Sequence, residues 1–325
     1  MDHGEGGAAT ARLLTEVFLR HLGNPGPLED AACLPGFDRI AFTTDTFVVR
    51  PPFFPGGDIG KLAVCGTVND LAVMGAVPRW ITAAFVLEEG LAISLLDRVV
   101  ASMAATAREA GVTVVGGDTK VVGRGEADGI FVNTSGVGFL PPQRALSVAA
   151  CRPGDQVIVS GPVGDHGTAV LLAREGFGLE GEVYSDCQPL GDLAAALLEA
   201  APDIRSMRDP TRGGLATVLV EMASASGVRI RIEEAAVPVR RSVRTACDLL
   251  GLDPLYVACE GRLVVVCPPE RTDDVLAAAR AHPRGREAAL IGGVGEGTCG
   301  LTLETVHGGR RPLVALEGAQ LPRIC

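Results

Sequence analysis

The sequence predicts a two-domain protein of the α/β or α+β class. Its 325 residues are more than one hydrophobic core normally holds, and a hydrophobic content of 47% is enough to fill two cores. Strand-like and helix-like segments alternate in both halves, which is typical of this fold class. Proline, glycine and polar residues interrupt the pattern near residue 145, where we place the domain boundary.

In the first half, an opening helix precedes alternating strands and helices. Leu14, Val17, Phe18 and Leu22 are spaced along one helical face, and Gly23 ends the helix. A glycine- and proline-rich stretch then leads to the first strand. We expect strands over residues 40–49, 78–89, 112–117 and 129–140, and helices over residues 59–74 and 94–111.

The second half shows another alternation of the same kind. Several Ala- and Leu-rich helices separate its strands, and we expect a short strand and then a tail after Pro312. The expected strands cover residues 155–161, 228–233, 262–266, 288–294 and 301–306.

Composition and charge exclude several classes of function. Lys and Arg total 29 against 39 acidic residues, and the net charge of −10 argues against a nucleic-acid partner. The first residues include acids where a signal peptide carries positive charge, and no apolar run is long enough to span a membrane. We therefore expect a cytoplasmic protein. The nine cysteines include no C-x-x-C pair, so neither a disulfide framework nor a cysteine-rich zinc site is expected.

Glycine-rich stretches suggest phosphate chemistry, but the familiar nucleotide motifs do not fit. Residues 55–62 resemble a P-loop, yet the glycine spacing is wrong and Lys61 precedes Leu62 rather than Ser or Thr. Residues 295–300 fit the pattern G-x-G-x-x-G, but a strand follows where a dinucleotide-binding fold needs a helix. A turn between strands is the better interpretation there.

Four aspartates that lie near glycines or inside apolar segments form a candidate metal–phosphate site: Asp30, Asp45, Asp70 and Asp118. Mg²⁺ prefers oxygen ligands and usually bridges to substrate phosphates. Asp70 is the most telling, because it interrupts an apolar helix beside Asn69, where an unpaired charge would be costly. Each aspartate alone could instead cap a helix or a turn.

A Gly-Gly turn in the second half could bind an anion. Asp209 and Thr211 precede Gly213 and Gly214, and the first backbone amides of the following helix would face the anion. An ordinary helix with an Asp-Pro-Thr cap explains the same residues equally well. A similar turn contains His166, which could be a capping, core or catalytic residue.

Two further residues could carry out acid–base or nucleophilic chemistry. Glu260 directly precedes an apolar strand, where burial would raise its pKa and make it a base, although a surface salt bridge is equally compatible. Cys325 is the last residue of the sequence. It is either an accident of an unconstrained end or a carrier thiol on a tail over residues 317–325, which could reach about 25 Å when extended.

Seven stretches together resemble the PurM-like family of ATP-dependent enzymes related to aminoimidazole ribonucleotide synthetase. Within that family they are most similar to the hydrogenase maturation branch, which the terminal Pro-Arg-Ile-Cys marks. The stretches follow the family's order and span nearly the whole chain, at residues 43–76, 85–91, 116–122, 160–167, 207–216, 258–262 and 322–325.

This resemblance implies a two-domain PurM-like fold and a homodimer. The first domains of two chains would join in a shared β-barrel, with ATP held near the subunit interface. The implied organisation is an N-terminal helix with a glycine-rich ATP-loop arm (1–39), an ATP- and Mg²⁺-binding domain (40–145), a C-terminal α/β domain (146–316) and a mobile tail (317–325).

The resemblance also implies a reaction. A carbamoyltransferase, HypF, would load a carbamoyl group onto the terminal cysteine, and this chain would use ATP to dehydrate that group to a thiocyanate. The cyanide would then pass to iron on a HypC–HypD scaffold and become a ligand of the NiFe hydrogenase site.

The resemblance assigns roles to particular residues. Cys325 would carry the group, Glu260 would be the base and Lys120 would assist it. Mg²⁺ would be held by Asp45, Asp70 and Asp118. The ATP-binding residues would be Asp30, Lys61, Asn69, Asp209, Thr211, Gly213 and Gly214. One departure concerns the aspartate pair of the family's glycine loop, whose first position is Glu29 here, which leaves its role as a metal ligand open.

Two kinds of alternative remain. Another PurM-like activity, selenophosphate synthetase or thiamine monophosphate kinase, is one; the former needs a reactive residue near the N-terminus, and only Cys33 is available. Neither activity explains a terminal cysteine. A nucleotide-binding scaffold without catalysis is the other, and in it Glu260 and Lys120 would be dispensable.

Overall fold

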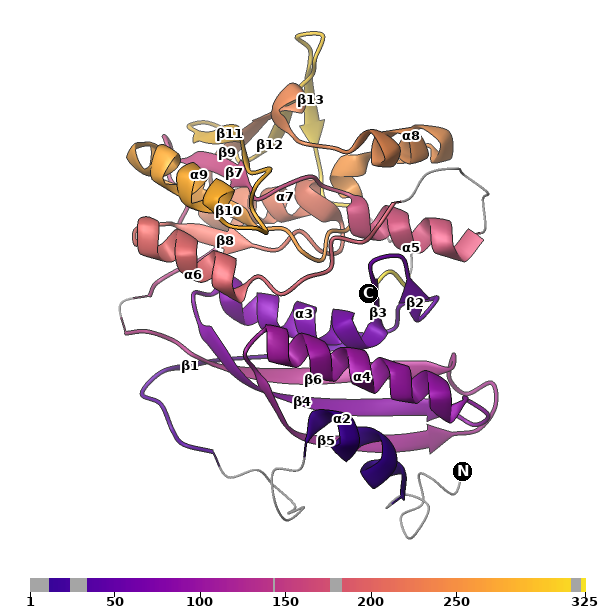
Figure 1. Ribbon diagram of the computed structural model, residues 1–325. Helices are drawn as coiled ribbons and strands as arrows, with labels where there is room; N and C mark the ends of the chain where they lie inside the picture. The colour runs from indigo at the N-terminus through magenta and orange to yellow at the C-terminus, as the bar shows by residue number, and fades with distance from the viewer. Residues whose placement is uncertain (1–11, 24–33, 143, 176–182, 317–322) are drawn as a thin grey trace.

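The structure is a computed structural model that describes residues 12–23, 34–142, 144–175, 183–316 and 323–325 (Figure 1). Its two main sheets lie in successive halves of the chain, one of four strands and one of seven. Among the described residues, no helix is long and apolar enough to cross a membrane.

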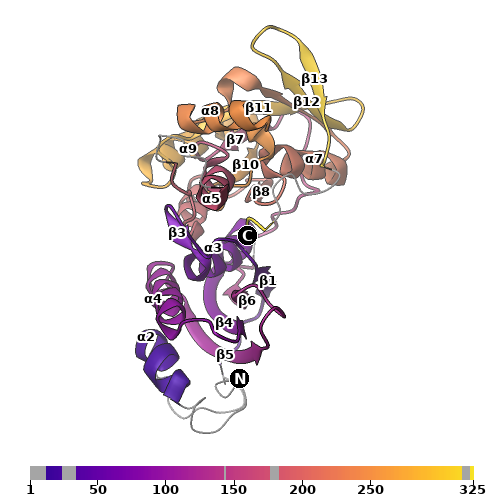
Figure 2. The ribbon, with the colours of Figure 1, turned by 90° about the vertical axis from the view of Figure 1, so that its right-hand side faces the viewer.

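The four-stranded sheet of the first half has the order β1-β6-β4-β5. Its neighbouring strands are antiparallel except β4 and β5, which run parallel. Helices α3 and α4 cover one of its faces, and among the described residues no helix covers the other face (Figure 2). The elements are α2 (Arg20–Leu22), β1 (Ile40–Phe47), β2 (Phe53–Phe54), β3 (Gly57–Asp58), α3 (Ile59–Val73), β4 (Val77–Glu88), α4 (Ile93–Glu109), β5 (Thr113–Val122) and β6 (Ile130–Phe139).

The seven-stranded sheet of the second half has the order β13-β12-β9-β11-β7-β10-β8. Helix α7 packs in the core on one face, and α6 and α9 pack in the core on the other. The elements are β7 (Gln156–Val159), α5 (Asp165–Glu175), α6 (Gly191–Ala200), β8 (Ser206–Arg208), α7 (Gly214–Ser226), β9 (Arg229–Glu233), α8 (Arg241–Leu250), β10 (Val264–Cys267), α9 (Thr272–Ala281), β11 (Ala289–Gly295), β12 (Gly300–Glu304) and β13 (Arg310–Leu313).

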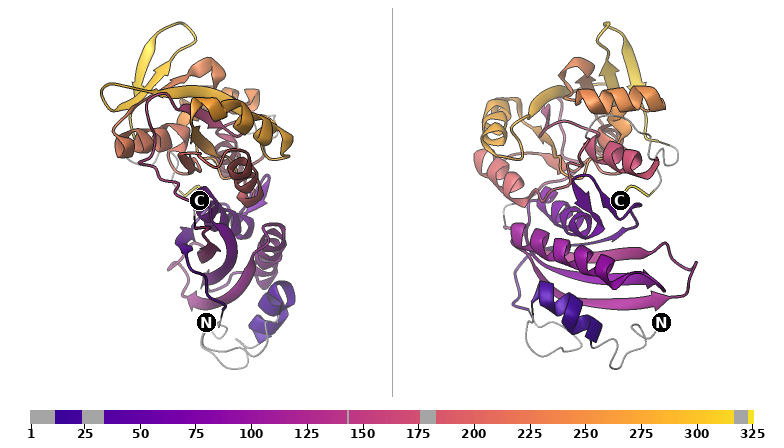
Figure 3. Two further views of the ribbon diagram at one scale, coloured as in Figure 1. Left: turned by 90° about the vertical axis from the view of Figure 1, so that its left-hand side faces the viewer. Right: turned by 45° about the vertical axis from the view of Figure 1, so that its right-hand side comes forward.

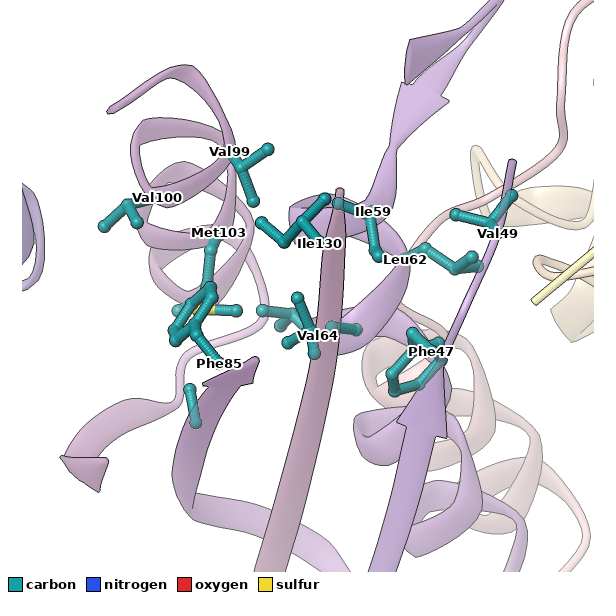
Figure 4. Close-up of a cluster of buried hydrophobic side chains, with 14 of the residues drawn as sticks. Phe47, Val49, Ile59, Leu62, Val64, Phe85, Val99, Val100, Met103 and Ile130 are labelled. Carbon is teal, nitrogen blue, oxygen red and sulfur yellow. The ribbon is translucent and has the colours of Figure 1, made fainter. Parts of the chain in front are cut away.

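The first hydrophobic core explains why buried and exposed residues alternate along the strands of the four-stranded sheet. Inward-facing side chains such as Phe47, Phe85 and Ile130 meet Met103 of α4 and Leu62 of α3, as Figure 4 shows. Each of these side chains is at most 2% exposed. The outward-facing residues alternate with them and stay partly exposed, which is the period-2 pattern from which these strands were predicted.

Most sequence-based element predictions are confirmed. The opening helix is present, although its first part, Leu14–Leu19, is a π-helical segment that runs into α2. Residues 295–300 connect β11 to β12, so the turn interpretation is correct. The short strands β2, β3 and β8 were not predicted, because two or three residues show no periodicity. Pro312 lies inside β13, an edge strand, where a missing N–H is tolerated.

Helix α3 lies between the four-stranded sheet and the second half of the chain, as the views in Figure 3 show. It therefore buries nearly its whole surface, which explains its apolar sequence. Asp58 caps it by accepting hydrogen bonds from the amides of Gly60 and Lys61 at 2.8 and 3.1 Å. A side chain at Gly60 would lie 2.2 Å from the carbonyl oxygen of Val99, so α3 and α4 meet through this glycine.

Asn69 of α3 ties the two halves together. Its amide nitrogen donates to the carbonyl oxygens of Gln188 and Glu260 at 3.2 and 3.3 Å, and its amide oxygen accepts from the Leu190 amide at 2.8 Å. The side chain is 1% exposed, so these bonds do not compete with water. The packing beside them is continuous, because Ala72 of α3 belongs to the same core as α6.

Replacing Asn69 with Ala should lower the free energy of unfolding by about 2 kcal/mol or more, since buried partners would lose their hydrogen bonds. Denaturant unfolding would measure the change. The matched control is Gln156→Ala, whose amide makes only a bond to nearby Gly154 and should cost much less. Equal losses in the two variants would show that Asn69 does not hold the halves together.

Candidate active site at the domain junction

Four carboxylates gather where the two halves meet. Asp45 lies on the inward-facing side of β1, Asp70 on α3, Asp209 directly after β8, and Glu260 before β10. Burial raises the pKa of each one, and Asp45 further raises the pKa of Asp70. The Asp209 carboxyl has its pKa raised to about 7, first by burial and then by the charge of Asp70. The site therefore concentrates negative charge in a poorly hydrated place.

Glu260 is held by its backbone and not by its carboxylate. The buried Asp186 accepts hydrogen bonds from the amides of Glu260 and Gly261, each at 3.2 Å, and lies 3.6 Å from the Arg262 guanidinium. A Cβ on Gly261 would lie 1.8 Å from the Asp186 carbonyl oxygen, so only glycine fits there. Glu260 is 2% exposed, and its Oε1 has no hydrogen-bond partner among the described residues.

Burial is also the main reason that the pKa of Glu260 lies well above its usual value, with the charges of Cys187 and Asp209 adding to it. A raised pKa makes the ionised carboxylate a stronger base than an ordinary glutamate. The unpartnered oxygen is free to bind a reacting group.

The Gly-Gly turn begins α7 as predicted, and the Asp-Pro-Thr cap that was the alternative interpretation is not formed. The N-cap residue is Gly213, with φ of +77°, and no side chain caps the helix. Gly214 follows with φ of +60°, a conformation that favours glycine. Thr217 Oγ1, in the first turn of α7, is buried and has no partner among the described residues. A helix start without a side-chain cap suits an anion such as a phosphate group.

The last residue of the chain lies in this junction. Cys325 packs against the first core, and its carbonyl oxygen accepts from the Val48 amide at 3.1 Å. Burial, followed by the charge of Glu260, raises the pKa of the Cys325 thiol to about 12, while Arg212 partly offsets this. The thiol and the proposed base are therefore close enough to interact electrostatically.

The carboxylates fit a cation by charge rather than by preformed geometry. In the part of the chain that the structure describes, no group of three or more His, Cys, Asp or Glu side chains is arranged to hold a metal ion. Burial raises the pKa of Asp45 and Asp70, so their ionised forms are poorly solvated, and one Glu260 oxygen has no partner among the described residues; a bound divalent cation would relieve both. Oxygen ligands of this kind are those that Mg²⁺ prefers.

Two predicted site residues lie away from this cluster. Asp118 and Lys120 are on the outward-facing side of β5, at the sheet edge opposite β1, and they pair with each other at 2.9 Å. Both side chains are about two-thirds exposed, at 64% and 65%. Three strand spacings of about 4.8 Å each separate β5 from β1, so Asp118 does not reach Asp45 of its own chain.

The remaining predicted residues lie in different places. The bonds of Asn69 described above show that its amide braces the two halves, and its contact with a nucleotide stays a prediction. Lys61 is half-buried and donates to the Gly56 carbonyl oxygen at 3.1 Å, beside the cluster. Thr211 lies in the turn before α7. Asp30, Glu29 and Cys33 lie outside the described residues.

Sequence reasoning missed two residues of the site. Arg212, in the turn before α7, is the nearby cation that lowers the pKa of both Asp45 and Cys325. The sequence did point to Arg212, because it directly precedes the Gly-Gly pair. Asp186 gave no signal, because its function depends on contacts with residues 74 positions further along the chain.

Comparison with known proteins first defines the class. The N-terminal domain of AIR synthase related proteins matches residues 28–140, and the C-terminal domain of the same family matches residues 152–303. The chain therefore belongs to the AIR synthase related family, and its fold is the PurM-like fold predicted from the sequence.

Within that family the chain belongs to the HypE carbamoyl dehydratases. It is 52% identical to carbamoyl dehydratase HypE of Azotobacter vinelandii, with coverage of 100% of this chain and 96% of the relative. It is 53% identical to HypE of Rhodobacter capsulatus, covering 100% and 97%. A crystal structure of HypE in complex with ATP superposes with a TM-score of 0.96 at 49% identity, covering 100% and 99%.

Two more distant comparisons separate the alternatives. A crystal structure of a HypE–HypF complex matches with a TM-score of 0.84 at 44% identity, covering 95% of this chain and 100% of the other. A thiamine-monophosphate kinase from Stenotrophomonas maltophilia matches with a TM-score of 0.68 at 20% identity, covering 93% and 97%. The latter likeness shows the fold alone.

Replacing Asp209 with Asn should stabilise the protein, and more so as the pH rises. Burial raises its pKa from the usual 3.8 to about 7, so the folded state keeps a proton that the unfolded state releases. Wild-type stability should therefore fall as the pH rises from about 4 to about 7 and stay low above that. The gain of the variant, measured by denaturant unfolding without ligands, should grow over this window and then level off.

Asp248→Asn is the control for this experiment, because Asp248 is exposed on α8. Its effect should be small and nearly independent of pH. If the Asp209 variant behaved in the same way, Asp209 would be shown to be ionised in the folded protein, and the charge concentration described here would be wrong.

Proposed function

We propose that this chain is an ATP-dependent carbamoyl dehydratase of hydrogenase maturation that acts on its own Cys325. The substrate would be a carbamoyl group carried by the sulfur, and the product a thiocyanate that supplies cyanide to the iron of a NiFe hydrogenase. The observation that carries this proposal is the position of Cys325, beside the buried and unpartnered Glu260 at the domain junction.

The chemistry needs two proton removals and one leaving group. ATP would transfer its γ-phosphoryl group to the carboxamide oxygen, with release of ADP and loss of one proton from the nitrogen. The carbon–oxygen bond would then break, phosphate would leave with the bonding electrons, and loss of the second proton would complete the C≡N bond. Glu260 is the base we assign to the nitrogen, since its raised pKa suits it to accept a proton.

The pKa of Cys325 separates loading from dehydration. A thiol with a pKa of about 12 is almost entirely protonated at neutral pH and is a poor nucleophile. Loading by attack on a carbamoyl donor therefore requires the tail to leave the junction. An S-carbamoyl group carries no charge, so burial beside Glu260 does not penalise it in the same way. Cys325 would thus be carbamoylated outside the domain junction, and its carbamoyl group would be dehydrated inside it.

The ATP site would lie between the carboxylates and the start of α7. The turn at Thr211, Gly213 and Gly214 would face the phosphates, with Lys61 and Asp209 near them and Asp30 completing the set as the resemblance implies. Asp45 and Asp70, together with Asp118 supplied by a second chain, would hold Mg²⁺, which would neutralise charge on the transferred phosphoryl group. The structure of a relative with ATP supports the nucleotide assignment.

In a homodimer, Asp118 and Lys120 could contribute to the active site of the partner chain. The face of the four-stranded sheet that no described helix covers carries both of them, and on β1 it exposes Phe42 by 66% and Ile40 by 55%. Two such faces could close into a barrel, in which these residues would serve the site of the partner chain. The remaining partners we propose are HypF for loading, in line with the HypE–HypF structure, and a HypC–HypD complex as cyanide acceptor, in the cytoplasm.

Replacing Glu260 with Gln should preserve loading and slow dehydration by about 100-fold or more, the usual contribution of a general base. The full chain would be incubated with the carbamoyltransferase, carbamoyl phosphate and ATP, and the C-terminal peptide followed by mass spectrometry. The wild type should gain a carbamoyl group and then lose one water only when ATP is present.

The control is Glu270→Gln, because Glu270 lies in a short helical turn away from the junction. Its loading and dehydration should match the wild type. A wild-type adduct that never loses water, or an adduct on another cysteine, would favour a nucleotide-binding scaffold without catalysis.

Replacing Phe42 with Asp should convert the dimer to a monomer, because it places a charge within the proposed apolar contact. Light scattering would measure the mass. Leu249→Asp is the matched control, since Leu249 is 64% exposed on α8 and lies outside the sheet face. A Phe42 variant that keeps the mass of the wild type would place the dimer contact elsewhere.

A further inference from the structure

The end of the chain is held by its backbone, as an added strand would be. The carbonyl oxygen of Cys325 accepts from the Val48 amide at 3.1 Å, and that of Arg323 accepts from the Arg50 amide at 3.3 Å. Val48 and Arg50 directly follow β1, an edge strand of the four-stranded sheet. An extended peptide that pairs with a sheet edge in this way gains affinity from main-chain bonds, whatever its side chains.

The carbonyl between these two binds His166. The Nε2 atom of His166 lies 3.0 Å from the Ile324 carbonyl oxygen, and Nδ1 lies 2.8 Å from the Ser185 hydroxyl. Because a carbonyl can only accept, Nε2 carries the proton, and the neutral ring accepts from Ser185 through Nδ1. His166 is 0% exposed, and its ring meets Phe54 edge-on at 5.3 Å. This histidine is therefore a fixed donor aimed at the tail.

The Arg323 side chain holds the tail on its other side. Its guanidinium pairs with the Asp128 carboxylate, donates to the Val48 carbonyl oxygen at 3.1 Å and lies 5.7 Å from the centre of the Phe131 ring. Arg323 has φ of +56°, which is unfavourable for a residue other than glycine. The contacts around it must therefore offset this strain.

The Ile324 side chain fills a tight pocket next to the histidine. It is 5% exposed, and a Cβ added to Gly167 would lie 3.5 Å from its Cδ1 and 2.6 Å from Val257. Arg174 of α5 adds a bond of 2.8 Å to the Arg323 carbonyl oxygen. Among the described residues, none of the bonds that fix Arg323, Ile324 and Cys325 uses the Cys325 sulfur.

We propose that His166 and Asp128 are positioning residues of the dehydration, as parts of a receptor for the terminal Arg-Ile-Cys that also includes Val48, Arg50 and Arg174. The receptor fixes the main chain and Arg323, so the sulfur faces Glu260 whether it carries a hydrogen or a carbamoyl group. This role rests on the proposed function, since it places the group that reacts. Neither residue takes part in the chemistry itself.

The first test measures docking without any catalysis. The full chain is treated with iodoacetamide near pH 8, and alkylation of Cys325 is followed on its C-terminal peptide by mass spectrometry. The free peptide Leu-Pro-Arg-Ile-Cys gives the rate of an undocked thiol. Because burial raises the pKa of the docked thiol, we expect the wild type to react at least about tenfold more slowly than the peptide.

Asp128→Ala and His166→Phe should each speed this alkylation by about fivefold or more, since each removes a charge-assisted or buried hydrogen bond to the tail. Asp128→Glu and His166→Gln, which keep an acceptor and a donor, should restore part of the protection. Asp97→Ala is the matched control: its carboxylate pairs with Arg20 and His21, away from the tail, and its rate should equal that of the wild type. Asp128 is partly exposed, so this variant tests the receptor even if the His166 variant does not fold.

The second test measures dehydration of the loaded protein. Asp128→Ala should lower kcat and leave the KM for ATP unchanged, since it displaces the reacting group and not the nucleotide. Unchanged alkylation in both the Asp128 and the His166 variants, or a wild type as reactive as the peptide, would overturn the receptor. A protected Cys325 whose carbamoyl group never dehydrates would overturn the proposed function and leave the receptor in place.

Discussion

The burial of like charges at the domain junction is the constraint on which the rest of this structure depends. Asp45, Asp70, Asp209 and Glu260 come from four separate segments, and all four have pKa values raised chiefly by burial. Such a cluster opposes folding unless protons or cations accompany it. The two cores and the bonds of Asn69 must offset that cost. The fold therefore accepts a loss of stability at the place where the proposed active site lies.

The negative charges at the domain junction also act on the C-terminal tail. A thiolate brought into the junction would meet carboxylates, whereas a neutral thiol or a neutral carbamoyl group meets less opposition. The charge state of the sulfur therefore helps to decide where the tail resides. The receptor around His166 and Asp128 holds the tail through bonds that do not involve the sulfur. The bonds that hold the tail in the junction are thus separate from the sulfur, whose charge decides how readily the tail enters.

Sequence patterns predicted the elements that bury a face. The inward-facing residues of β1 and β6 alternate with exposed ones, and α4 has a clear apolar stripe, so their periods were readable. Strands of two or three residues were missed because so short a segment has no period. The resemblance extended this to the PurM-like fold and to the HypE branch, both of which the comparisons show.

The candidate site was only partly predictable. Cys325 and Glu260 share the junction with the metal-type aspartates Asp45 and Asp70, as the resemblance implied. The orientation of β5 was not readable, because Gly116 and Gly117 precede Asp118 and a bulge shifts its register. Contacts between distant segments, such as Asp186 with Glu260 or Asp128 with Arg323, leave no local trace in a single sequence.

Two adjacent residues of α3, Asn69 and Asp70, bond to different halves of the chain, and this restricts how the halves can move. Asn69 grips the second half of the chain through its bonds to Gln188, Glu260 and Leu190, while Asp70 beside it accepts from Thr43 within the first sheet. A hinge motion of one half against the other would have to break the first set of bonds, and it would carry the segment of Glu260 away from Asp70. Opening of the protein and dispersal of its catalytic charges are therefore one movement, and a rigid junction keeps the charges together.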